Sequence, residues 1–349
     1  MSLASRSGLR LVGDVGGTNV RFALADITGP TPRLFACQSS LCADYPGIEE
    51  AIEHYLQSAP AQGARPRAAA IAVAGPVTGG AAELTNGLWR ISEAALIEAG
   101  FPSARLINDY TALALSVRHL EPQDLGSIGD ATAPAPAANQ TVAVLGAGTG
   151  LGVSAAVRDG SSEAIATTEG GHMAFAPGDE VEIEILRQLT TQFGRVSLER
   201  LLSGPGLVSL RWALGRIAGQ QAEPLTPEEI VARATAGEDD LCVESLDRFC
   251  GIYGAAAGEI ALVYGARGGV YLGGGIAANI LGWLRQSAFR SRFEAKGRFV
   301  EYVKAIPTQV ILHPFAALLG AAQSLQSGRV AGSATMAADV PSEQPRLSH

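Results

Sequence analysis

The sequence predicts an α/β protein built from two domains. Apolar segments with the periodicity of strands and of helices alternate along the chain. The chain has 349 residues, more than a single hydrophobic core usually serves, and 47% of them are hydrophobic. A hairpin with a glycine-rich tip occurs twice, and Thr149 of the second follows Thr18 of the first by 131 positions. This repeat indicates duplicated domains that face one ligand.

The first hairpin is predicted from LRLVGDVGGTNVRFALAD, residues 9–26, in which two apolar arms flank a tip at 16–19. Successive backbone N–H groups at a glycine-rich turn can hold a phosphate without a lysine. Asp14 would then hold Mg²⁺ or water beside that phosphate. Glycine and asparagine also favour ordinary hairpin turns, so the tip alone leaves a plain turn open.

The next elements are a helix and two strands that lead to an Asn-Asp pair. We expect a helix over 47–58, a strand over 68–74, a strand ending at Ile107 and a helix over 110–118. Asn108 and Asp109 follow the strand, at the position where open α/β sheets expose functional groups. Asp109 is a candidate general base for a hydroxyl nucleophile, with Asn108 bound to a neighbouring hydroxyl. Both residue types also suit a plain helix cap.

The second hairpin follows a loop at 128–139 that is rich in Ala and Pro. Residues 141–157, TVAVLGAGTGLGVSAAV, again place apolar arms around a Gly-Thr turn. A dinucleotide-binding G-x-G-x-x-G reading fails, because Leu151 stands where the third glycine belongs and a strand rather than a helix follows. A second phosphate-binding hairpin fits better.

The last third of the chain predicts mainly helices. Thr226 and Glu229 form a capping box for a helix that ends near Gly237, and a long helix covers 240–264. A strand at 269–275 runs into a glycine turn before a helix over 276–285. This turn satisfies G-x-G-x-x-A but lacks the second strand and ribose-binding acid of a dinucleotide site. We expect it to contact the adenosine part of a nucleotide.

Two further segments carry candidate ligands for a sugar. Glu169 and His172 flank two glycines, and carboxylate and imidazole groups suit hydroxyls that both donate and accept. A Glu-x-x-His pair can also bind a metal on a helix, but the glycines disfavour a rigid helix here. Glu199 lies early in a short helix begun by Ser197, where an acid is favoured in any case. In LTNGLW, residues 84–89, Trp89 is expected in the core and Asn86 in a turn.

Composition excludes several classes of function. The net charge of −8 disfavours nucleic acid and anionic membranes as partners. Lys296 and Lys304 are the only lysines, which excludes a Walker A loop and a protein-kinase lysine. The four cysteines match neither a zinc knuckle nor a disulfide scaffold. Neither a signal peptide nor a membrane span is predicted, and a reduced, cytoplasmic chain is expected.

Taken in order, the motifs resemble those of the bacterial glucokinase family over residues 9–327. They are GDVGGTN (13–19), LTNGLW, INDY (107–110), GAGTGLG (146–152), EGGH (169–172), SLERLLSGPG (197–206) and YLGGGI (271–276). The related ROK group usually carries a zinc-binding cysteine cluster after its Glu-x-Gly-His motif. That cluster is missing, so the sequence is similar to the zinc-free branch. Tyr110 stands where many relatives have Phe, and residues 328–349 extend past the usual end.

The resemblance implies an actin-like ATPase (ribonuclease H-like) fold, with two α/β domains flanking a nucleotide and sugar cleft. The small domain would comprise 9–119 and 314–327, the large domain 120–313, and 328–349 a disordered tail. Asp109 would be the catalytic base for the sugar 6-hydroxyl, and the implied sugar ligands are Asn108, Asp109, Glu169, His172 and Glu199. The implied ATP contacts are Gly13, Asp14, Val15, Gly16, Gly17, Thr18, Gly146, Gly148, Thr149, Gly150, Gly274 and Gly275, with Asp14 at Mg²⁺.

The implied activity is ATP-dependent phosphorylation of glucose by a cytoplasmic homodimer. Three alternatives remain at this point: a non-catalytic sugar-responsive regulator, a hexose kinase of broader specificity, and a polymerising or chaperone-like ATPase on the same fold. The sequence fixes neither the preference among hexoses nor whether ADP or polyphosphate can replace ATP.

Overall fold

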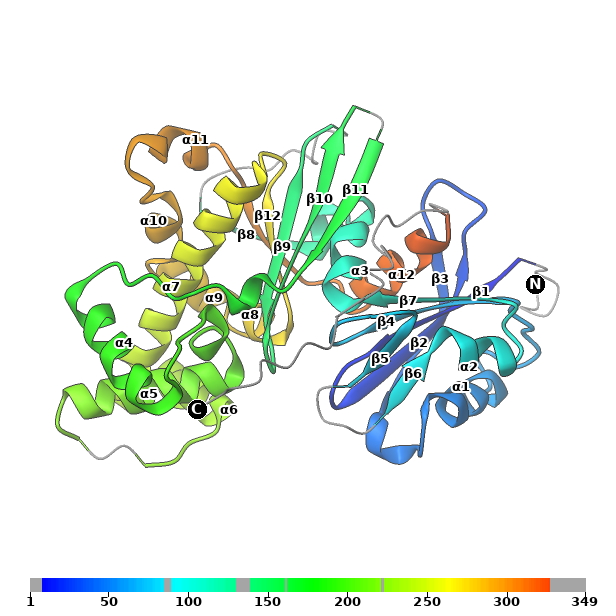
Figure 1. Cartoon of the computed structure of the whole chain (residues 1–349), viewed down its shortest axis with the longest axis horizontal. Helices are drawn as coiled ribbons and strands as arrows, with labels where there is room; N and C mark the ends of the chain where they lie inside the picture. The colour runs from blue at the N-terminus through cyan, green and yellow to red at the C-terminus, as the bar shows by residue number, and fades with distance from the viewer. Residues whose placement is uncertain (1–7, 85–88, 130–138, 161, 221–222, 327–349) are drawn as a thin grey trace, which may run out of the picture.

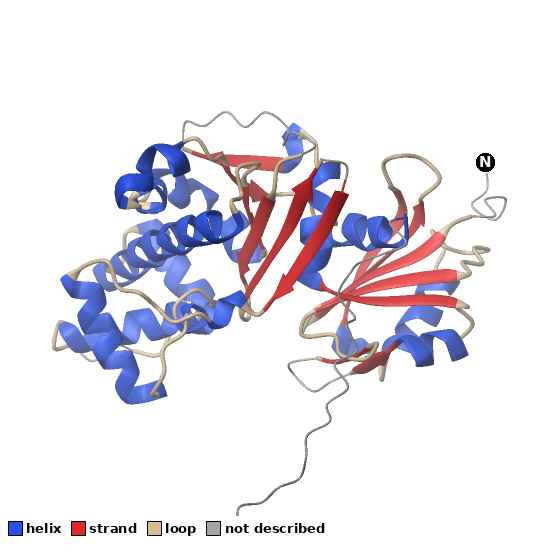
Figure 2. Cartoon of the chain, turned by 45° about the horizontal axis from the view of Figure 1, so that its top comes forward, coloured by secondary structure: helices blue, strands red, loops and turns tan. Residues whose placement is uncertain are grey.

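The computed structural model describes residues 8–84, 89–129, 139–160, 162–220 and 223–326. Two β-sheets form the framework, each with helices on both sides (Figure 1). Seen with strands and helices in separate colours, the two sheets lie side by side and most of the helices gather beyond the second (Figure 2). The sequence-based expectations for residues 130–138, for Asn86 and for the tail 328–349 lie outside the described residues.

The first sheet has the strand order β3-β2-β1-β4-β7. Its strands are β1 (Arg10–Val15), β2 (Asn19–Asp26), β3 (Arg33–Leu41), β4 (Ala68–Val73) and β7 (Ser103–Asn108). The first three strands are antiparallel neighbours, whereas β1, β4 and β7 run parallel. A separate two-stranded ribbon pairs β5 (Ala81–Glu83) with β6 (Arg90–Ser92).

The second sheet repeats this arrangement in the order β11-β10-β9-β12-β13-β8. Its strands are β8 (Leu125–Ile128), β9 (Val142–Ala147), β10 (Leu151–Asp159), β11 (Ser162–Thr168), β12 (Val270–Gly273) and β13 (Thr308–Ile311). An antiparallel group of three again precedes two parallel strands, with β8 added antiparallel at the edge. The repeat predicted from the two glycine-rich hairpins is therefore present in the sheet topology.

The helices divide into three groups by position. Those beside the first sheet are α1 (Ile48–Gln57) and α2 (Glu93–Glu98). Those between the sheets are α3 (Asp109–Ser116) and α12 (Ala316–Gln326). The remainder lie beyond the second sheet: α4 (Glu180–Phe193), α5 (Gly204–Ile217), α6 (Pro227–Ala236), α7 (Asp240–Tyr264), α8 (Gly275–Asn279), α9 (Leu281–Gln286), α10 (Phe289–Glu294) and α11 (Val300–Lys304).

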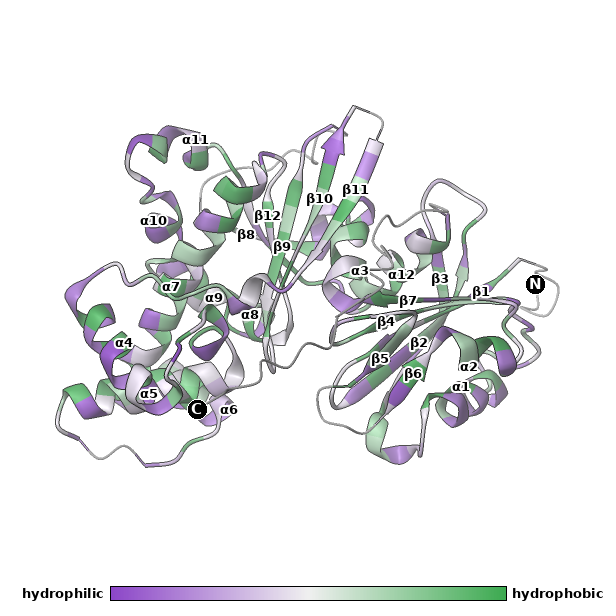
Figure 3. Ribbon diagram, in the orientation of Figure 1, coloured by the Kyte–Doolittle hydropathy of each residue, from purple (hydrophilic) through white to green (hydrophobic). Residues whose placement is uncertain are grey.

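Successive side chains of the central strands point to opposite faces of each sheet, and this alternation explains the layers. On β1, Leu11 packs into the core shared with α1, whereas Val12 packs into the core that contains α3 and α12. On β9, Val144 joins that same middle core, and Leu145 points to the core beneath α7. Hydrophobic residues accordingly run along the strands and along α7 (Figure 3). Both faces of the central strands β1, β4, β9 and β12 are buried, so the strand ends are where polar side chains of these strands can gather.

Several predicted elements agree closely with the structure, and two do not. The first hairpin, the helix at 48–57, the capping box of α6 and the long α7 are all observed, and Trp89 is buried as expected. The expected single helix over 276–285 is instead two short helices, because Ile280 leaves the helical conformation between them. The helix expected from Ser197 is only a 3-10 turn, Leu198–Arg200, and the Ser197 side chain does not cap it.

Candidate functional site

Asp109 lies at the first residue of α3, immediately after the parallel strand β7. Asn108 caps this helix: its Oδ1 accepts hydrogen bonds from the backbone N–H groups of Tyr110 and Thr111. Its Nδ2 donates to the Gly75 carbonyl at 3.2 Å and to Asp109 Oδ1 at 3.0 Å. The capping and the functional interpretations of this pair are therefore compatible. The Asn108 amide uses all of its donors and acceptors internally, so a sugar hydroxyl would have to exchange with one of these bonds.

The first glycine-rich turn lies at the same end of the sheet as Asp109. The turn closes with a 2.9 Å hydrogen bond from Gly16 N to the Asn19 carbonyl. In the strand register, Val15 stands beside Val73 and Val73 beside Asn108. Two steps across a sheet correspond to about 10 Å, so the turn and the Asn-Asp pair face the same space. The sequence prediction that these two motifs come together is consistent with this register.

Asp14 is held by an arginine that the sequence analysis did not single out. The Nη1 of Arg21 donates to Asp14 Oδ2 at 2.9 Å, and the two residues stand opposite each other on β1 and β2. Burial raises the pKa of Asp14, while the Arg21 guanidinium opposes this effect. Pairing Val15 with Val20 across the predicted turn would have placed Arg21 opposite Asp14, so the hairpin register was the available signal.

The environment of Asp109 favours a carboxyl that can exchange its proton near neutrality. Burial is the main cause that raises the pKa of Asp109 to about 7, and the charges of Asp14 and Glu169 raise it further. The backbone N–H of Tyr110 donates to Asp109 Oδ1 at 2.9 Å and opposes this rise. A pKa close to the working pH is what a general base requires.

The second glycine-rich turn connects β9 to β10. It closes through a 2.9 Å hydrogen bond from Gly148 N to the Gly150 carbonyl. The Gly148 carbonyl accepts from Gly204 N, the first residue of α5, at 2.8 Å. A Cβ built at Gly148 would meet no atom within 4 Å, so the space above this residue is open. An open, bare backbone is what an anion-binding turn requires.

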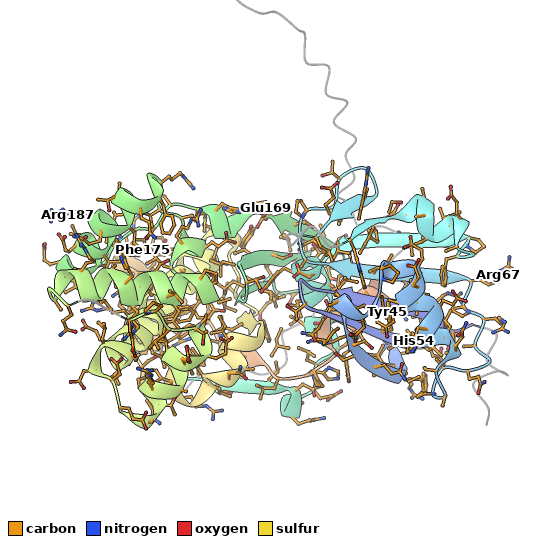
Figure 4. The ribbon with its side chains drawn as sticks, turned by 90° about the horizontal axis from the view of Figure 1, so that it is seen from below. Tyr45, His54, Arg67, Glu169, Phe175 and Arg187 are labelled. Carbon is orange, nitrogen blue, oxygen red and sulfur yellow. The ribbon has the colours of Figure 1, made fainter. Side chains whose placement is uncertain are left out.

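The predicted sugar ligands Glu169, His172 and Glu199 lie around this second turn. Glu169 and His172 bound the 3-10 turn Gly170–His172, and both are exposed. This turn is joined to the Glu199 turn by a 2.8 Å hydrogen bond from Leu198 N to the Met173 carbonyl. Glu199 Oε2 accepts from Leu151 N at 3.0 Å, directly after the glycine tip. Glu169 lies in the middle of the molecule, between the part carrying Arg187 and Phe175 and the part carrying Tyr45 and His54 (Figure 4).

The glycine turn after β12 is adjacent to the second hairpin. Gly273 pairs with Gly146 in the sheet, and Gly274 adopts φ +83, which favours glycine. Gly274 and Gly275 are both exposed, and a Cβ built at Gly275 would meet no atom within 4 Å. Gly274 is different, because a Cβ there would lie 2.6 Å from the Ala147 carbonyl oxygen. Close packing therefore accounts for Gly274, whereas Gly275 borders open space.

The candidate metal ligand is a single carboxylate. Among the residues that the structure describes, no three His, Cys, Asp or Glu side chains are grouped so as to hold a metal ion. One carboxylate such as Asp14 can be sufficient for Mg²⁺, which is often bound by one or two carboxylates and completes its coordination shell with water and phosphate oxygens. Within the same ranges, no helix is both long and apolar enough to cross a membrane.

Comparison with known sequences identifies the family of the chain. The family model described as "Glucokinase" matches residues 11–328. A glucokinase of Caulobacter sp. (strain K31) is 49% identical over 334 residues, covering 95% of this chain and 99% of that protein. A glucokinase of Xanthomonas campestris pv. campestris (strain B100) is 44% identical over 317 residues, covering 89% of this chain and 93% of the relative.

Comparison with solved structures gives the same relationship. A glucokinase from an Antarctic psychrotroph has a TM-score of 0.83 at 33% identity, covering 92% of this chain and 100% of its own. A ROK family glucokinase from Streptomyces griseus, solved with glucose and AMPPNP, has a TM-score of 0.61 at 18% identity and covers 92% and 100%. The second likeness concerns the fold alone, a sugar-kinase fold with mixed α/β sheets. From the sequence matches and the closer structural likeness, the chain belongs to the glucokinase family.

Proposed function

We propose that this chain catalyses transfer of the γ-phosphoryl group of ATP to the 6-hydroxyl of glucose, giving glucose 6-phosphate and ADP. The observation that carries the proposal is the register of the first sheet, in which Asp109 and the first glycine-rich turn lie at the same end of the strands. Membership of the glucokinase family supports glucose as the acceptor.

Asp109 is the general base of this proposal. A pKa of about 7 leaves its carboxylate available at neutral pH and basic enough to accept the hydroxyl proton as the oxygen attacks. Asn108, Glu169, His172 and Glu199 orient the other hydroxyls of the sugar. Their mixture of amide, carboxylate and imidazole matches hydroxyls that both donate and accept. Holding the attacking hydroxyl in place supplies much of the rate enhancement expected of such a site.

The two glycine-rich turns are the proposed nucleotide contacts. The N–H groups of Gly16 and Gly148 close the two turns, and we expect other main-chain groups within Gly13–Thr18 and Gly146–Gly150 to contact the phosphates. The open space over Gly148 and Gly275 fits an anionic ligand and its nucleoside. Bound Mg-ATP supplies the phosphoryl group, with Mg²⁺ neutralising its charge. Asp14 is the residue that would hold Mg²⁺ or its water shell, and Arg21 keeps this carboxylate oriented.

The larger-scale features of the proposal follow from the family. The sheets belong to an actin-like ATPase fold, with a small domain of 9–119 and 314–327 and a large domain of 120–313. Closure of the two domains on glucose excludes water, which would otherwise receive the phosphoryl group. The chain acts in glycolysis in the cytoplasm as a homodimer, and sedimentation would test the oligomeric state.

The test is a coupled assay for glucose 6-phosphate with the full-length chain, ATP and Mg²⁺, across a panel of hexoses and phosphoryl donors. We expect rapid transfer to glucose and slow ATP turnover without sugar. Comparable ATP hydrolysis with and without glucose would support a chaperone-like ATPase instead. Glucose binding without any phosphate transfer would support a regulator, for which a gel shift with DNA is the next measurement. Similar rates on several hexoses would broaden the acceptor class.

A further inference from the structure

Tyr110 joins the helix that carries the proposed base to the second glycine-rich hairpin. Its hydroxyl donates a 2.6 Å hydrogen bond to the carbonyl of Gly146, on β9 in the second sheet. Its backbone N–H donates to Asp109 Oδ1 at 2.9 Å. One residue therefore contacts the base through its main chain and the hairpin through its side chain. Gly146 precedes the turn at Gly148 by only two residues.

The ring of Tyr110 occupies a slot made of bare backbone. A Cβ built at Gly152, on β10, would overlap the ring, and one at Gly146 would lie 2.6 Å from the Tyr110 hydroxyl oxygen. A Cβ at Gly274 would lie 3.5 Å from the same oxygen. Two glycines of the second sheet, Gly146 and Gly152, thus make room for this one side chain, whereas Gly274, just after β12, is at ordinary contact distance from it. Gly146, expected from sequence to contact ATP, has this second role in the structure.

The hydroxyl of Tyr110 is a fixed donor at this position. Burial raises the pKa of Tyr110 well above its usual value, and the charge of Asp109 adds to the effect, so the hydroxyl keeps its proton across the working pH range. Thr111 makes a second link from α3, because its Oγ1 lies 2.6 Å from Thr167 Oγ1 on β11. That link reaches the edge strand, whereas the Tyr110 link reaches the strand that ends in the glycine tip.

We infer that Tyr110 is a positioning residue, whose hydroxyl fixes the distance between Asp109 and the second glycine-rich turn. The inference rests on the proposed function, in which Asp109 faces the sugar and the turn faces the nucleotide. Small errors in such a distance lower the rate of transfer without weakening the binding of either substrate. The glucose ligands themselves do not involve the hydroxyl.

The test compares Tyr110→Phe with Tyr55→Phe in the full-length chain. The first change removes the hydroxyl and keeps the ring. The second is a matched control, because the Tyr55 hydroxyl also donates to a backbone carbonyl, that of Ala36, at 3.0 Å, within the first sheet's own core. Both variants are assayed for kcat, for the KM of glucose, and for ATP hydrolysis without glucose.

For Tyr110→Phe we expect kcat to fall about three- to tenfold, the range that corresponds to one net hydrogen bond. The KM of glucose should stay within twofold, and the ratio of sugar-free hydrolysis to transfer should rise at least threefold. Loss of folded protein would lower both rates together and leave this ratio unchanged. Tyr55→Phe should alter neither kcat nor the ratio by more than twofold.

A Tyr110→Phe variant with kcat and the ratio both within twofold of the parent would overturn the inference. A fall in both rates at a constant ratio would also overturn it, because that result marks a purely structural role. A parent chain that phosphorylates no sugar would instead refute the proposed function, and Tyr55→Phe would then be equally inactive.

Discussion

Asp109 is surrounded by acids, and this determines what the residue can do. Glu169 and Asp14 both raise its pKa, in addition to the larger effect of burial. Arg21 is engaged with Asp14 rather than with Asp109. A carboxyl in such surroundings exchanges its proton near neutral pH, unlike an ordinary aspartate. The same surroundings give two predictions for this residue.

Asp109→Asn should abolish phosphate transfer while sparing sugar binding. The amide keeps the shape of the side chain but cannot accept the hydroxyl proton, so kcat should fall by about 10²- to 10⁴-fold. The Kd of glucose, measured by calorimetry or intrinsic fluorescence, should change only a few-fold. A variant with near-parental kcat would remove Asp109 from the role of base.

The pH dependence of kcat/KM for glucose should show the titration of Asp109. The base acts only when deprotonated, so activity should be lost as the pH falls through about 7 and reach a plateau above that value. Steady-state rates measured from about pH 5.5 to about pH 8.5 would define this limb. A profile that stays flat down to about pH 5 would show an unperturbed carboxyl instead.

For single residues of the candidate site, the sequence predicted the residue types better than it predicted their hydrogen-bond partners. Asn108 and Asp109 were identified from their place between a strand and a helix, and the structure puts them at that junction. The Arg21 partner of Asp14 and the Tyr110 hydroxyl bond were not identified. The hairpin register could have indicated Arg21, whereas the Tyr110 bond depends on a rotamer and on a neighbour distant in sequence, which local patterns do not encode.

The crossing of α3 and α12 is the tightest contact between helices in the middle layer. A Cβ built at Gly320, on α12, would overlap the backbone carbonyl of Ala112 on α3. Ala112, Ala321 and Ala322 are fully buried around this crossing. Small residues therefore let the two backbones approach each other, and α3 carries the candidate base at its first residue.

Gly320→Ala should destabilise the protein by at least about 2 kcal/mol, because backbone rather than a flexible side chain would have to move. Gly282→Ala is the matched control: Gly282 also lies in a helix, and a Cβ there would meet no atom within 4 Å. That substitution should be neutral or slightly stabilising. Thermal denaturation of both variants would check this, and equal melting temperatures would contradict the tight crossing.

Elements with strong local signals were predicted, and those that depend on tertiary context were not. The capping box at Thr226 and the positive-φ Gly237 delimit α6 as expected. The edge strand β3, RLFACQSSL, is mostly half-buried and carries no clear alternation, so periodicity did not reveal it. Helix α5 begins with Gly-Pro-Gly, which reads locally as a turn.

At the scale of the whole molecule, a largely buried ion pair joins two helices of the outer helical layer. Glu182 on α4 accepts two hydrogen bonds from Arg292 on α10, at 2.7 and 2.9 Å, although 110 positions separate them in sequence. The Glu182 side chain is 1% exposed, and it also accepts from Gly178 N at 2.6 Å. Removal of one partner would leave the guanidinium only partly compensated.

Glu182→Ala should therefore lower stability by about 3 kcal/mol, the lower end of the range for broken buried pairs because Arg292 is partly exposed. Glu184→Ala provides the comparison on the same helix, where the pair with Arg187 lies at the surface. The control should have a far smaller effect on the melting temperature. Similar melting temperatures for the two variants would show that the buried pair does not contribute to stability.

The repeat of the two sheets is the feature of the whole chain that the sequence indicated best. Two glycine-rich hairpins were visible in the sequence, and each proves to be the antiparallel part of a sheet with parallel strands beyond it. Little in the sequence indicated the layer that α3 and α12 form between the sheets. It brings together segments about 200 residues apart, and only their common burial reveals the contact.

The central claim is that two glycine-rich turns, one from each sheet, bind the phosphates of ATP while Asp109 faces the sugar. The most direct test is a crystal structure of the chain with glucose and a non-hydrolysable ATP analogue. It should show the Asp109 carboxylate within hydrogen-bonding distance of the 6-hydroxyl and backbone N–H groups of both turns on the phosphates. A complex in which Asp109 is remote from the sugar, or in which neither turn contacts the nucleotide, would contradict the claim.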